Sequence, residues 1–232
     1  MRLSYDIVVV GAGHAGAEAA SAAARLGSRT LLITIDMEKI ASMSCNPAVG
    51  GVAKGQIVRE IDALGGQMAR ITDQSAIQFR MLNRSKGAAM WSPRAQCDKS
   101  EFSRLWRRTL ENTRNLYLWQ DSVTEILLDH TGEKVAVRGV KTRMGVEIEC
   151  RRVVLTAGTF LGGLMHCGTN SAEGGRAGDE ASHGITEQLV SLGFESGRMK
   201  TGTPARLDAR TINFDALEVQ EGDIEPSKFS YD

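Results

Sequence analysis

The 232-residue sequence has no apolar run near the roughly 20 residues that a transmembrane helix requires, so we expect no membrane-spanning segment. It also lacks a signal-peptide pattern, because the N-terminus leads directly into a strand-like run. The four cysteines are scattered and form no Cys-x-x-Cys pair, which argues against a zinc site or a disulfide framework. These absences favour a reducing, cytoplasmic environment.

A surplus of charge of either sign is also missing. Lys plus Arg and Asp plus Glu number 28 each, so the formal net charge is zero and nothing global demands a nucleic-acid or membrane partner. Proline is scarce at 4 residues, whereas glycine is abundant at 25, which is typical of a turn-rich α/β protein that cradles a ligand. The length permits one large domain or two small ones.

Residues 5–35 carry the strongest local pattern. An apolar, β-branched run at 6–10 is followed by GAGHAG at 11–16, an alanine-rich run and a second apolar run at 30–35. An apolar run without alternation predicts a buried parallel strand, and alanine favours helix. Strand, glycine turn, helix and strand form the context that a G-x-G-x-x-G motif needs, so the stretch predicts a dinucleotide-binding βαβ unit.

Each glycine of this motif has an expected task. Gly11 allows the sharp turn, Gly13 lets the backbone approach a pyrophosphate, and Gly16 lets the helix lie close to the strand. An acid that holds the ribose hydroxyls should end the second strand, but the neutral Thr34 stands there, with Asp36 two residues on. Either Asp36 or the backbone makes this contact, or the ribose is held elsewhere. No Arg or Lys occupies the strand end, which argues against NADP.

The next segment contains the turn signals Asn-Pro and Gly-Gly and predicts a loop. A helix is expected from 53 to 64, with Ile57, Ile61 and Leu64 on one face. The loop places Cys45 shortly before this helix N-terminus, a position that favours a nucleophilic thiolate. The alternative is a buried, inert cysteine.

Residues 70–99 are polar and rich in amides, and their pattern indicates irregular structure. A helix is expected at 101–112, because apolar residues recur there at helical spacing. Between positions 80 and 114, nine Lys or Arg stand against three acids, a surplus of six. Such a cluster can follow the phosphates of a nucleic acid, or it can be an ordinary solvated face.

Short strands are expected next, at 116–119, 123–128, 135–144 and 146–150. The last two flank Gly145 and predict a hairpin. A buried strand at 153–158 ends on small residues, and we expect it to return to the parallel sheet beside the cofactor.

A glycine loop at 174–179 contains Arg176, which either binds a carboxylate or phosphate or is salt-bridged within the loop. A helix is expected at 180–192, followed by a turn-rich basic patch at 200–206. The tail from 208 to 232 is acidic and lacks strong periodicity or a closing element. We interpret it as the end of a fragment.

Eight motifs then point to one known family, whose order they follow along essentially the whole chain. They are GAGHAGAEAA (11–20), MSCNPAVGGVAKG (43–55), REIDALGG (59–66), MLNRSKG (81–87), RAQCD (94–98), LTAGTFLGG (155–163), GGRAG (174–178) and GRMKTGTPARLD (197–208). In these motifs the chain resembles the N-terminal part of the tRNA uridine 5-carboxymethylaminomethyl modification enzyme family, also called MnmG or glucose-inhibited division protein A.

The resemblance implies an α/β fold: an FAD-binding, Rossmann-like parallel sheet of the glutathione-reductase type with a small inserted β-rich region at about 116–150. Family members are homodimers and far longer than this chain. Residues 1–232 are therefore expected to form a partial FAD-binding domain, with an insertion domain starting at about 200. The family's C-terminal part, which engages a partner GTPase of the MnmE type, is absent, and the fragment alone is expected to be inactive.

The family's chemistry implies FAD, NADH and methylene-tetrahydrofolate as the carbon donor, with the NADH site mostly outside this chain. Its substrate is tRNA, whose wobble uridine receives a carboxymethylaminomethyl or aminomethyl group at C5. Cys45 matches the family's functional cysteine, and the family's basic surface favours tRNA contact by residues 80–108. The family's FAD contacts carry over to Gly11, Ala12, Gly13, His14, Ala15, Gly16, Val123 and Ser182.

Two other functions stay open on the sequence alone. One is a folate- and FAD-dependent tRNA uracil methyltransferase, which shares the fold and the carbon source, although the motifs at 43–54 and 81–98 fit the first family better. The other is a non-catalytic module that binds FAD or RNA.

Overall fold

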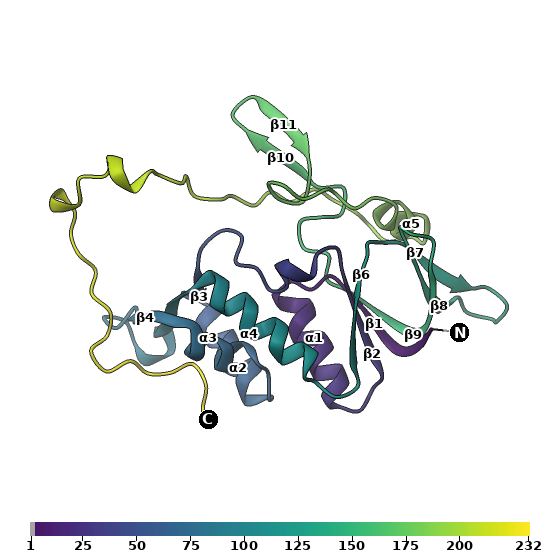
Figure 1. Cartoon of the computed structure of the whole chain (residues 1–232), viewed down its shortest axis with the longest axis horizontal. Helices are drawn as coiled ribbons and strands as arrows, with labels where there is room; N and C mark the ends of the chain where they lie inside the picture. Colours follow the sequence, from purple (N-terminus) through teal and green to yellow (C-terminus); the bar gives the residue numbers. More distant parts are fainter. Residues whose placement is uncertain (1–2) are drawn as a thin grey trace.

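The computed structural model describes residues 3–232 as an α/β fold built on a six-stranded main sheet (Figure 1). Its strands are β1 (Ser4–Val10), β2 (Thr30–Thr34), β6 (Leu116–Gln120), β7 (Val123–Asp129), β8 (Ala136–Thr142) and β9 (Glu147–Leu155). They lie in the order β6-β2-β1-β9-β8-β7. The pairs β6–β2, β2–β1 and β1–β9 are parallel, whereas β8 is antiparallel to β7 and β9. The predicted α/β fold with a Rossmann-like parallel sheet is confirmed.

Strand β1 is covered on both faces, as its unbroken apolar sequence predicts. Successive side chains of a strand point to opposite faces, so Val9 joins one apolar core and Val8 joins a second. Helix α1 (His14–Arg25) covers the first face with the buried Ala17 and Ala20. The small side chain of alanine lets this helix lie close to the sheet.

The second core gathers residues of β1 and β2 with those of the antiparallel strands and of α5 (Ile185–Ser191). Strand β6 pairs in parallel with β2, so it belongs to the parallel part of the main sheet, and the β-meander consists of β7, β8 and β9. The hairpin around Gly145 is confirmed, with φ +81° at this glycine. The separate strands expected at 146–150 and 153–158 are one continuous strand, β9.

A second sheet contains β3 (Ala48–Gly50), β4 (Ala76–Leu82) and β5 (Ser92–Cys97), in the order β3-β5-β4 with antiparallel pairing. It packs against α2 (Lys54–Ala63) and α3 (Met68–Ser75), and α4 (Lys99–Glu111) lies between α3 and α1 (Figure 1). The prediction of irregular structure at 70–99 is therefore wrong. Phe79, Met81 and Ala95 are buried there, but polar residues alternate with them and obscured the strand pattern.

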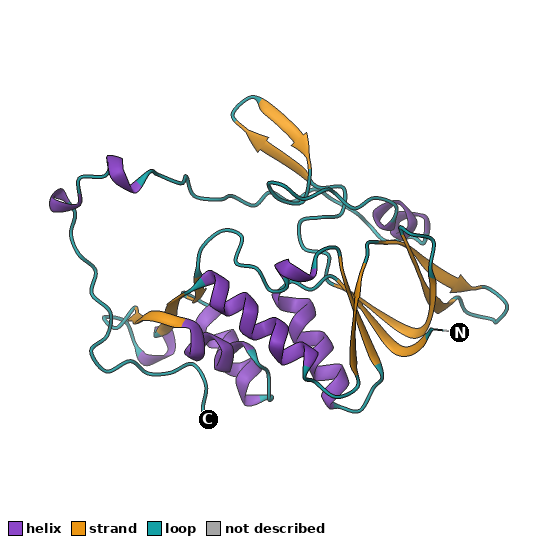
Figure 2. Cartoon of the chain, in the orientation of Figure 1, coloured by secondary structure: helices purple, strands orange, loops and turns teal. Residues whose placement is uncertain are grey.

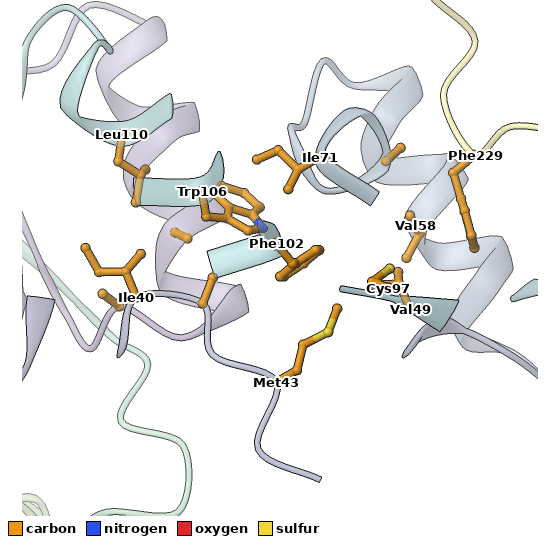
Figure 3. Packing of buried hydrophobic residues seen from close by; sticks show 14 of the residues in the cluster. Ile40, Met43, Val49, Val58, Ile71, Cys97, Phe102, Trp106, Leu110 and Phe229 are labelled. Atoms are coloured by element: carbon orange, nitrogen blue, oxygen red, sulfur yellow. The ribbon is translucent and has the colours of Figure 1, made fainter. Parts of the chain in front are cut away.

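Helix α4 confirms the predicted helical spacing. Phe102, Trp106 and Leu110 are fully buried and lie in one cluster with Ile71 of α3 (Figure 3). The side chain of Asp98 caps the helix by accepting from the backbone N–H groups of Ser100 and Glu101, each at 2.9 Å.

Helix α2 lies where it was predicted, but the apolar residues expected on one face are not the ones that it buries. Gly55 and Val58 are buried, whereas Ile57 and Leu64 are 52% and 90% exposed. The reason is the close approach of β5: a Cβ on Gly55 would lie 2.4 Å from the carbonyl oxygen of Pro93. Only a glycine permits this contact, so the glycine, and not the larger apolar residues, sets the orientation of the helix.

The remaining elements are small. Strands β10 (Leu164–Cys167) and β11 (Asn170–Glu173) form a separate antiparallel hairpin, and α5 is shorter than the helix expected at 180–192. Short 3-10 helices lie at Met37–Lys39, Ala88–Met90, Ala209–Thr211 and Phe214–Ala216. Within residues 3–232, no helix is both long enough and apolar enough to cross a membrane.

The chain from Gly193 onward is mostly loop (Figure 2), yet its end is anchored, contrary to the expected tail without a closing element. Phe229 is fully buried and packs edge-to-face on Phe79, with ring centroids 5.6 Å apart. The carboxylate of Asp73 accepts from the backbone N–H groups of Phe229 and Ser230, at 2.8 and 2.9 Å. Residues 229–230 thus dock onto the second sheet and α3.

We expect Phe229→Ala to lower the free energy of unfolding by about 3–5 kcal/mol, because the substitution empties a fully buried site. Urea denaturation of the chain measures this change. Phe214→Ala is the matched control, since Phe214 lies in the same tail and is 61% exposed. Equal losses for the two variants would contradict the anchoring role of Phe229.

Candidate functional site

The glycine turn between β1 and α1 has the geometry of a phosphate-binding loop. Gly11 has φ +97°, and a Cβ there would lie 2.6 Å from the carbonyl oxygen of Thr156. A Cβ on Gly16 would lie 1.8 Å from the carbonyl oxygen of Gly11. Both positions therefore require glycine for the turn and for close packing of the helix.

Gly13 differs from the other two glycines because a Cβ there would meet nothing within 4 Å. Gly13 and Ala15 are exposed, whereas Ala12 is buried, so the turn presents one open side. Gly13 is also the N-cap of α1, which has no side-chain capping hydrogen bond and no acid in its first turn. The positive end of the helix dipole thus faces an open space without a competing carboxylate.

Thr156, directly after β9, locks this turn in place. Its hydroxyl donates to the carbonyl oxygens of Val10 and Gly11, at 2.8 and 2.9 Å, and its N–H donates to Val10 O at 2.9 Å. The sequence predicted that the strand at 153–158 returns beside the turn, but it did not identify Thr156. The threonine directly after the apolar run at 153–155 was the available signal. Val154 is 36% exposed, so this strand end is not buried, contrary to the prediction from the sequence.

His14 joins the glycine turn to the loop that leads to Cys45. Its half-buried ring donates from Nε2 to the carbonyl oxygen of Ala41 at 3.0 Å and packs edge-to-face on Phe102, at 5.6 Å and 88°. Burial lowers the pKa of His14 below its ordinary value of 6.5, although the hydrogen bond to Ala41 opposes this effect. The neutral ring is therefore the form that the fold stabilises.

This shift predicts a pH dependence of stability. Folded His14 binds a proton less readily than unfolded His14, so the free energy of unfolding is highest above pH 6.5 and falls as the pH decreases below it. The slope contributed by this one group is at most about 1.4 kcal/mol per pH unit. Urea titrations between pH 7 and about pH 5 test this, and His14→Gln should flatten the slope. A His14→Gln variant that keeps the full slope would contradict the assignment.

The end of β2 leaves the ribose contact open. Thr34 is buried, and its hydroxyl donates to the carbonyl oxygen of Asp36 at 3.3 Å. The Asp36 carboxylate accepts from the N–H of Glu38 at 2.9 Å and lies 3.3 Å from the Lys39 ammonium. The side chain of Asp36 is thus already engaged by the 3-10 helix that follows it.

Cys45 is exposed and not buried, and its reactivity stays a prediction. Strand β3 separates it from α2, so the helix does not follow the cysteine loop directly as the sequence predicted. Its Sγ lies 3.6 Å from Oγ1 of Thr203, which belongs to the 200–206 patch. The chain thus brings two sequence motifs, 158 residues apart, to one place.

Two arginines hold the neighbouring Ser44. Arg206 donates from Nη2 to the Ser44 carbonyl at 3.1 Å, and Arg176 donates from Nη1 to its hydroxyl at 2.9 Å. Arg176 also forms an ion pair with Asp179, which in turn pairs with Lys39. Of the two alternatives for Arg176, the structure supports the salt-bridged one. These contacts tie Ser44, next to Cys45, to the 174–179 loop and to the 200–206 patch.

The two remaining predicted cofactor residues lie in different surroundings. Val123 is the first residue of β7 and is 3% exposed, within the second core. Ser182 forms a bridge with Leu161 and lies three residues before α5, not at the start of a helix as predicted. Their role as FAD contacts stays a prediction.

The basic stretch at residues 80–114 includes arginines of α4 that are paired with acids. Arg104 pairs with Glu101, and Arg107 pairs with Glu38 and Glu111, so these residues of α4 form an ordinary solvated face.

Within residues 3–232, no group of three or more His, Cys, Asp or Glu has an arrangement that could hold a metal ion.

Sequence comparisons match the chain to one family. A family model described as glucose inhibited division protein A matches residues 6–232. The chain is 62% identical over 231 residues to the tRNA uridine 5-carboxymethylaminomethyl modification enzyme MnmG of Porphyromonas gingivalis, and 59% identical over 227 residues to that of Cytophaga hutchinsonii. These alignments cover 100% and 98% of this chain but 36% of each relative. The chain therefore spans about a third of the length of the curated relatives it matches.

Comparisons with solved structures agree with the sequence comparisons. GidA of Aquifex aeolicus has a TM-score of 0.93 at 49% identity, covering 98% of this chain and 37% of that chain. The GidA-related protein from Thermus thermophilus has a TM-score of 0.59 at 26% identity, covering 82% and 69%. PqsL of Pseudomonas aeruginosa, described as a probable FAD-dependent monooxygenase, shares the fold alone, with a TM-score of 0.50 at 15% identity, covering 85% and 48%. Because the family model spans nearly the whole sequence, this chain belongs to the glucose inhibited division protein A family.

Proposed function

We propose that this chain is the FAD-binding part of an enzyme that adds a carboxymethylaminomethyl or aminomethyl group to C5 of the wobble uridine of certain tRNAs. The observation that carries the proposal is the open space at Gly13, at the N-terminus of α1. It occurs in a chain that is 62% identical to a tRNA uridine modification enzyme.

The residues of the glycine turn fit the pyrophosphate of FAD. A cofactor phosphate needs close backbone approach, unpaired N–H groups and no competing acid, and the open side of the turn offers these features. Val123 and Ser182 would supply further contacts. Bound FAD would supply the hydride and one-carbon redox chemistry, while the protein supplies orientation and charge.

Cys45 is the proposed nucleophile or acid/base of this chain, acting near the flavin ring. Its exposure permits contact with a substrate, and its loop is held by Arg176 and Arg206. Thr203 is the neighbouring group that can orient the thiol. NADH and methylene-tetrahydrofolate are the proposed co-reactants, with the NADH site mostly outside this chain.

The partners are proposed from the family as well. They are tRNA, a GTPase of the MnmE type that engages a region absent from this chain, and a second copy of the protein, all in the cytoplasm. The chain alone is proposed to be a partial FAD-binding domain, with the start of an insertion domain from about 200, that does not complete the reaction.

Two measurements test this function. The visible spectrum of the purified chain should show bound flavin; a colourless chain that takes up no added FAD would contradict the cofactor site. One-carbon transfer to tRNA should then be measured with a chimera in which this chain replaces the matching third of the Porphyromonas gingivalis relative. A carboxymethylaminomethyl or aminomethyl product supports the proposal, a 5-methyl product identifies a methyltransferase instead, and no product from a flavin-loaded chimera favours a non-catalytic module.

A further inference from the structure

The second sheet places two arginines directly opposite each other. Arg80 of β4 pairs with Arg94 of β5 in the antiparallel register, and Gln78 pairs with Gln96 beside them. Side chains directly across an antiparallel pair lie on the same face of the sheet. Phe79 and Ala95, which alternate with these residues, are buried toward the helices. We call the opposite face, with Gln78, Arg80, Arg94 and Gln96, the guanidinium–amide face.

Neither arginine of this face has a hydrogen bond or ion pair from its side chain to any residue between 3 and 232, and Nη1 of Arg80 is buried without a partner. Asp223 of the neighbouring tail is already engaged, because it accepts from the N–H of Met81 and from Arg84, each at 2.9 Å. Like charges directly opposite each other in a sheet are destabilising, and a buried N–H donor without a partner is costly. The pair therefore lacks a negative group.

One oxyanion between the two guanidinium groups would remove both costs. The planar guanidinium group presents parallel N–H donors that match phosphate oxygens, and two such groups can neutralise one phosphate. The amide groups of Gln78 and Gln96 can donate further hydrogen bonds, although Gln78 already donates to the carbonyl oxygen of Gln220 at 3.1 Å.

The surroundings favour a polynucleotide over a single small anion. The β4–β5 connection next to the face carries the exposed Lys86 and the 45%-exposed ring of Trp91, whose Nε1 donates to the Lys86 carbonyl at 3.3 Å. A cation that follows phosphates beside an aromatic ring that stacks on bases is the usual composition of a single-strand RNA site. The open space proposed for FAD lies elsewhere, at the end of β1 in the main sheet.

We propose that Arg80 and Arg94 form a binding site for a backbone phosphate of an RNA strand, with Trp91 as a stacking platform for an adjacent base. The assignment of RNA rests on the proposed function, whereas the phosphate site itself rests only on the arginine pair. The site would hold tRNA on the second sheet while the chemistry takes place near Cys45.

The first experiment tests the phosphate site by thermal unfolding of the chain in inorganic phosphate and in chloride at equal ionic strength. Phosphate should raise the midpoint of the wild type by several degrees more than that of the Arg80→Gln/Arg94→Gln variant. In chloride the double variant should be at least as stable as the wild type, because the repulsion is gone. Arg114→Gln, at an exposed position, should respond to phosphate as the wild type does. Equal phosphate responses of wild type and double variant overturn the site.

The second experiment measures the affinity of the chain for a tRNA transcript over a range of salt concentrations. The double variant should bind more weakly and lose about one unit from the slope of log K against log salt, as expected for one lost phosphate contact. Trp91→Ala should weaken binding about tenfold with an unchanged slope. Unchanged tRNA affinity overturns the RNA assignment, and loss of bound FAD in the double variant shows that the site serves the cofactor. If the double variant keeps its flavin but loses affinity for tRNA, the RNA site is supported. Because flavin binding is unchanged in that outcome, it can be distinguished from a failure of the proposed function.

Discussion

Replacing Gly13 with alanine is expected to abolish flavin copurification while leaving the chain folded. A Cβ at this position meets no protein atom within 4 Å, so the apo fold tolerates it. The same Cβ enters the space that the pyrophosphate of FAD would occupy, where the backbone must approach the phosphate closely. The visible spectrum of the purified variant measures bound flavin, and circular dichroism checks the fold.

Two matched substitutions make this result specific. Gly197→Ala also adds a Cβ to open space, but far along the chain in the 193–208 loop, so it should keep the flavin. Gly16→Ala should lose flavin together with stability, because its Cβ would overlap the carbonyl oxygen of Gly11. A Gly13→Ala protein that stays fully yellow would refute the site assignment, since no structural damage could then be invoked.

The βαβ unit at residues 5–35 could be predicted because its signals are local. The apolar runs, the three glycines and the alanine-rich helix each act within a few residues, and their steric roles follow from covalent geometry. The structure agrees for Gly11 and Gly16 in detail, down to the atoms that a Cβ would meet. Helix α4 was equally predictable, since its buried residues recur at helical spacing over three turns.

The second sheet could not be predicted in the same way. In β4 the side chains of Gln78 and Arg80 alternate with Phe79 and Met81, but the run is short and the amides and charges dominate its composition. What makes β4 a strand is its pairing with β5, and strand pairing depends on residues distant in sequence. The buried face of α2 was missed for a similar reason, because the position of Pro93 against Gly55 is set by tertiary contact.

The contacts around the candidate site join residues that are far apart in the sequence. The bonds from Arg176 and Arg206 to Ser44 join residues 132 and 162 positions apart. No periodicity or local motif encodes such a contact. The motifs could therefore indicate that both segments contribute to function, but only the fold shows that the 200–206 patch lies against the cysteine loop.

Cys45→Ser is expected to leave flavin binding intact and to abolish modification of tRNA, measured as one-carbon transfer by the chimera with the Porphyromonas gingivalis relative. Serine is isosteric, so the exposed loop and its hydrogen bonds from Arg176 and Arg206 should persist. A hydroxyl lacks the nucleophilicity of a thiolate, so the chemistry assigned to this position should stop. The fold and the flavin spectrum then report on structure, and the tRNA product reports on chemistry.

Cys167→Ser is the matched control, because Cys167 of β10 is also an exposed free thiol and should be dispensable. Alkylation of the native chain should label Cys45 and Cys167 but spare the buried Cys97 and Cys150. Burial raises the pKa of the Cys150 thiol to about 11, which adds to its lack of access. If Cys45→Ser modifies tRNA as well as Cys167→Ser does, Cys45 has no chemical role. In that case the contacts of Arg176 and Arg206 serve only to hold the loop against the 200–206 patch, and the reactive group of the enzyme lies elsewhere.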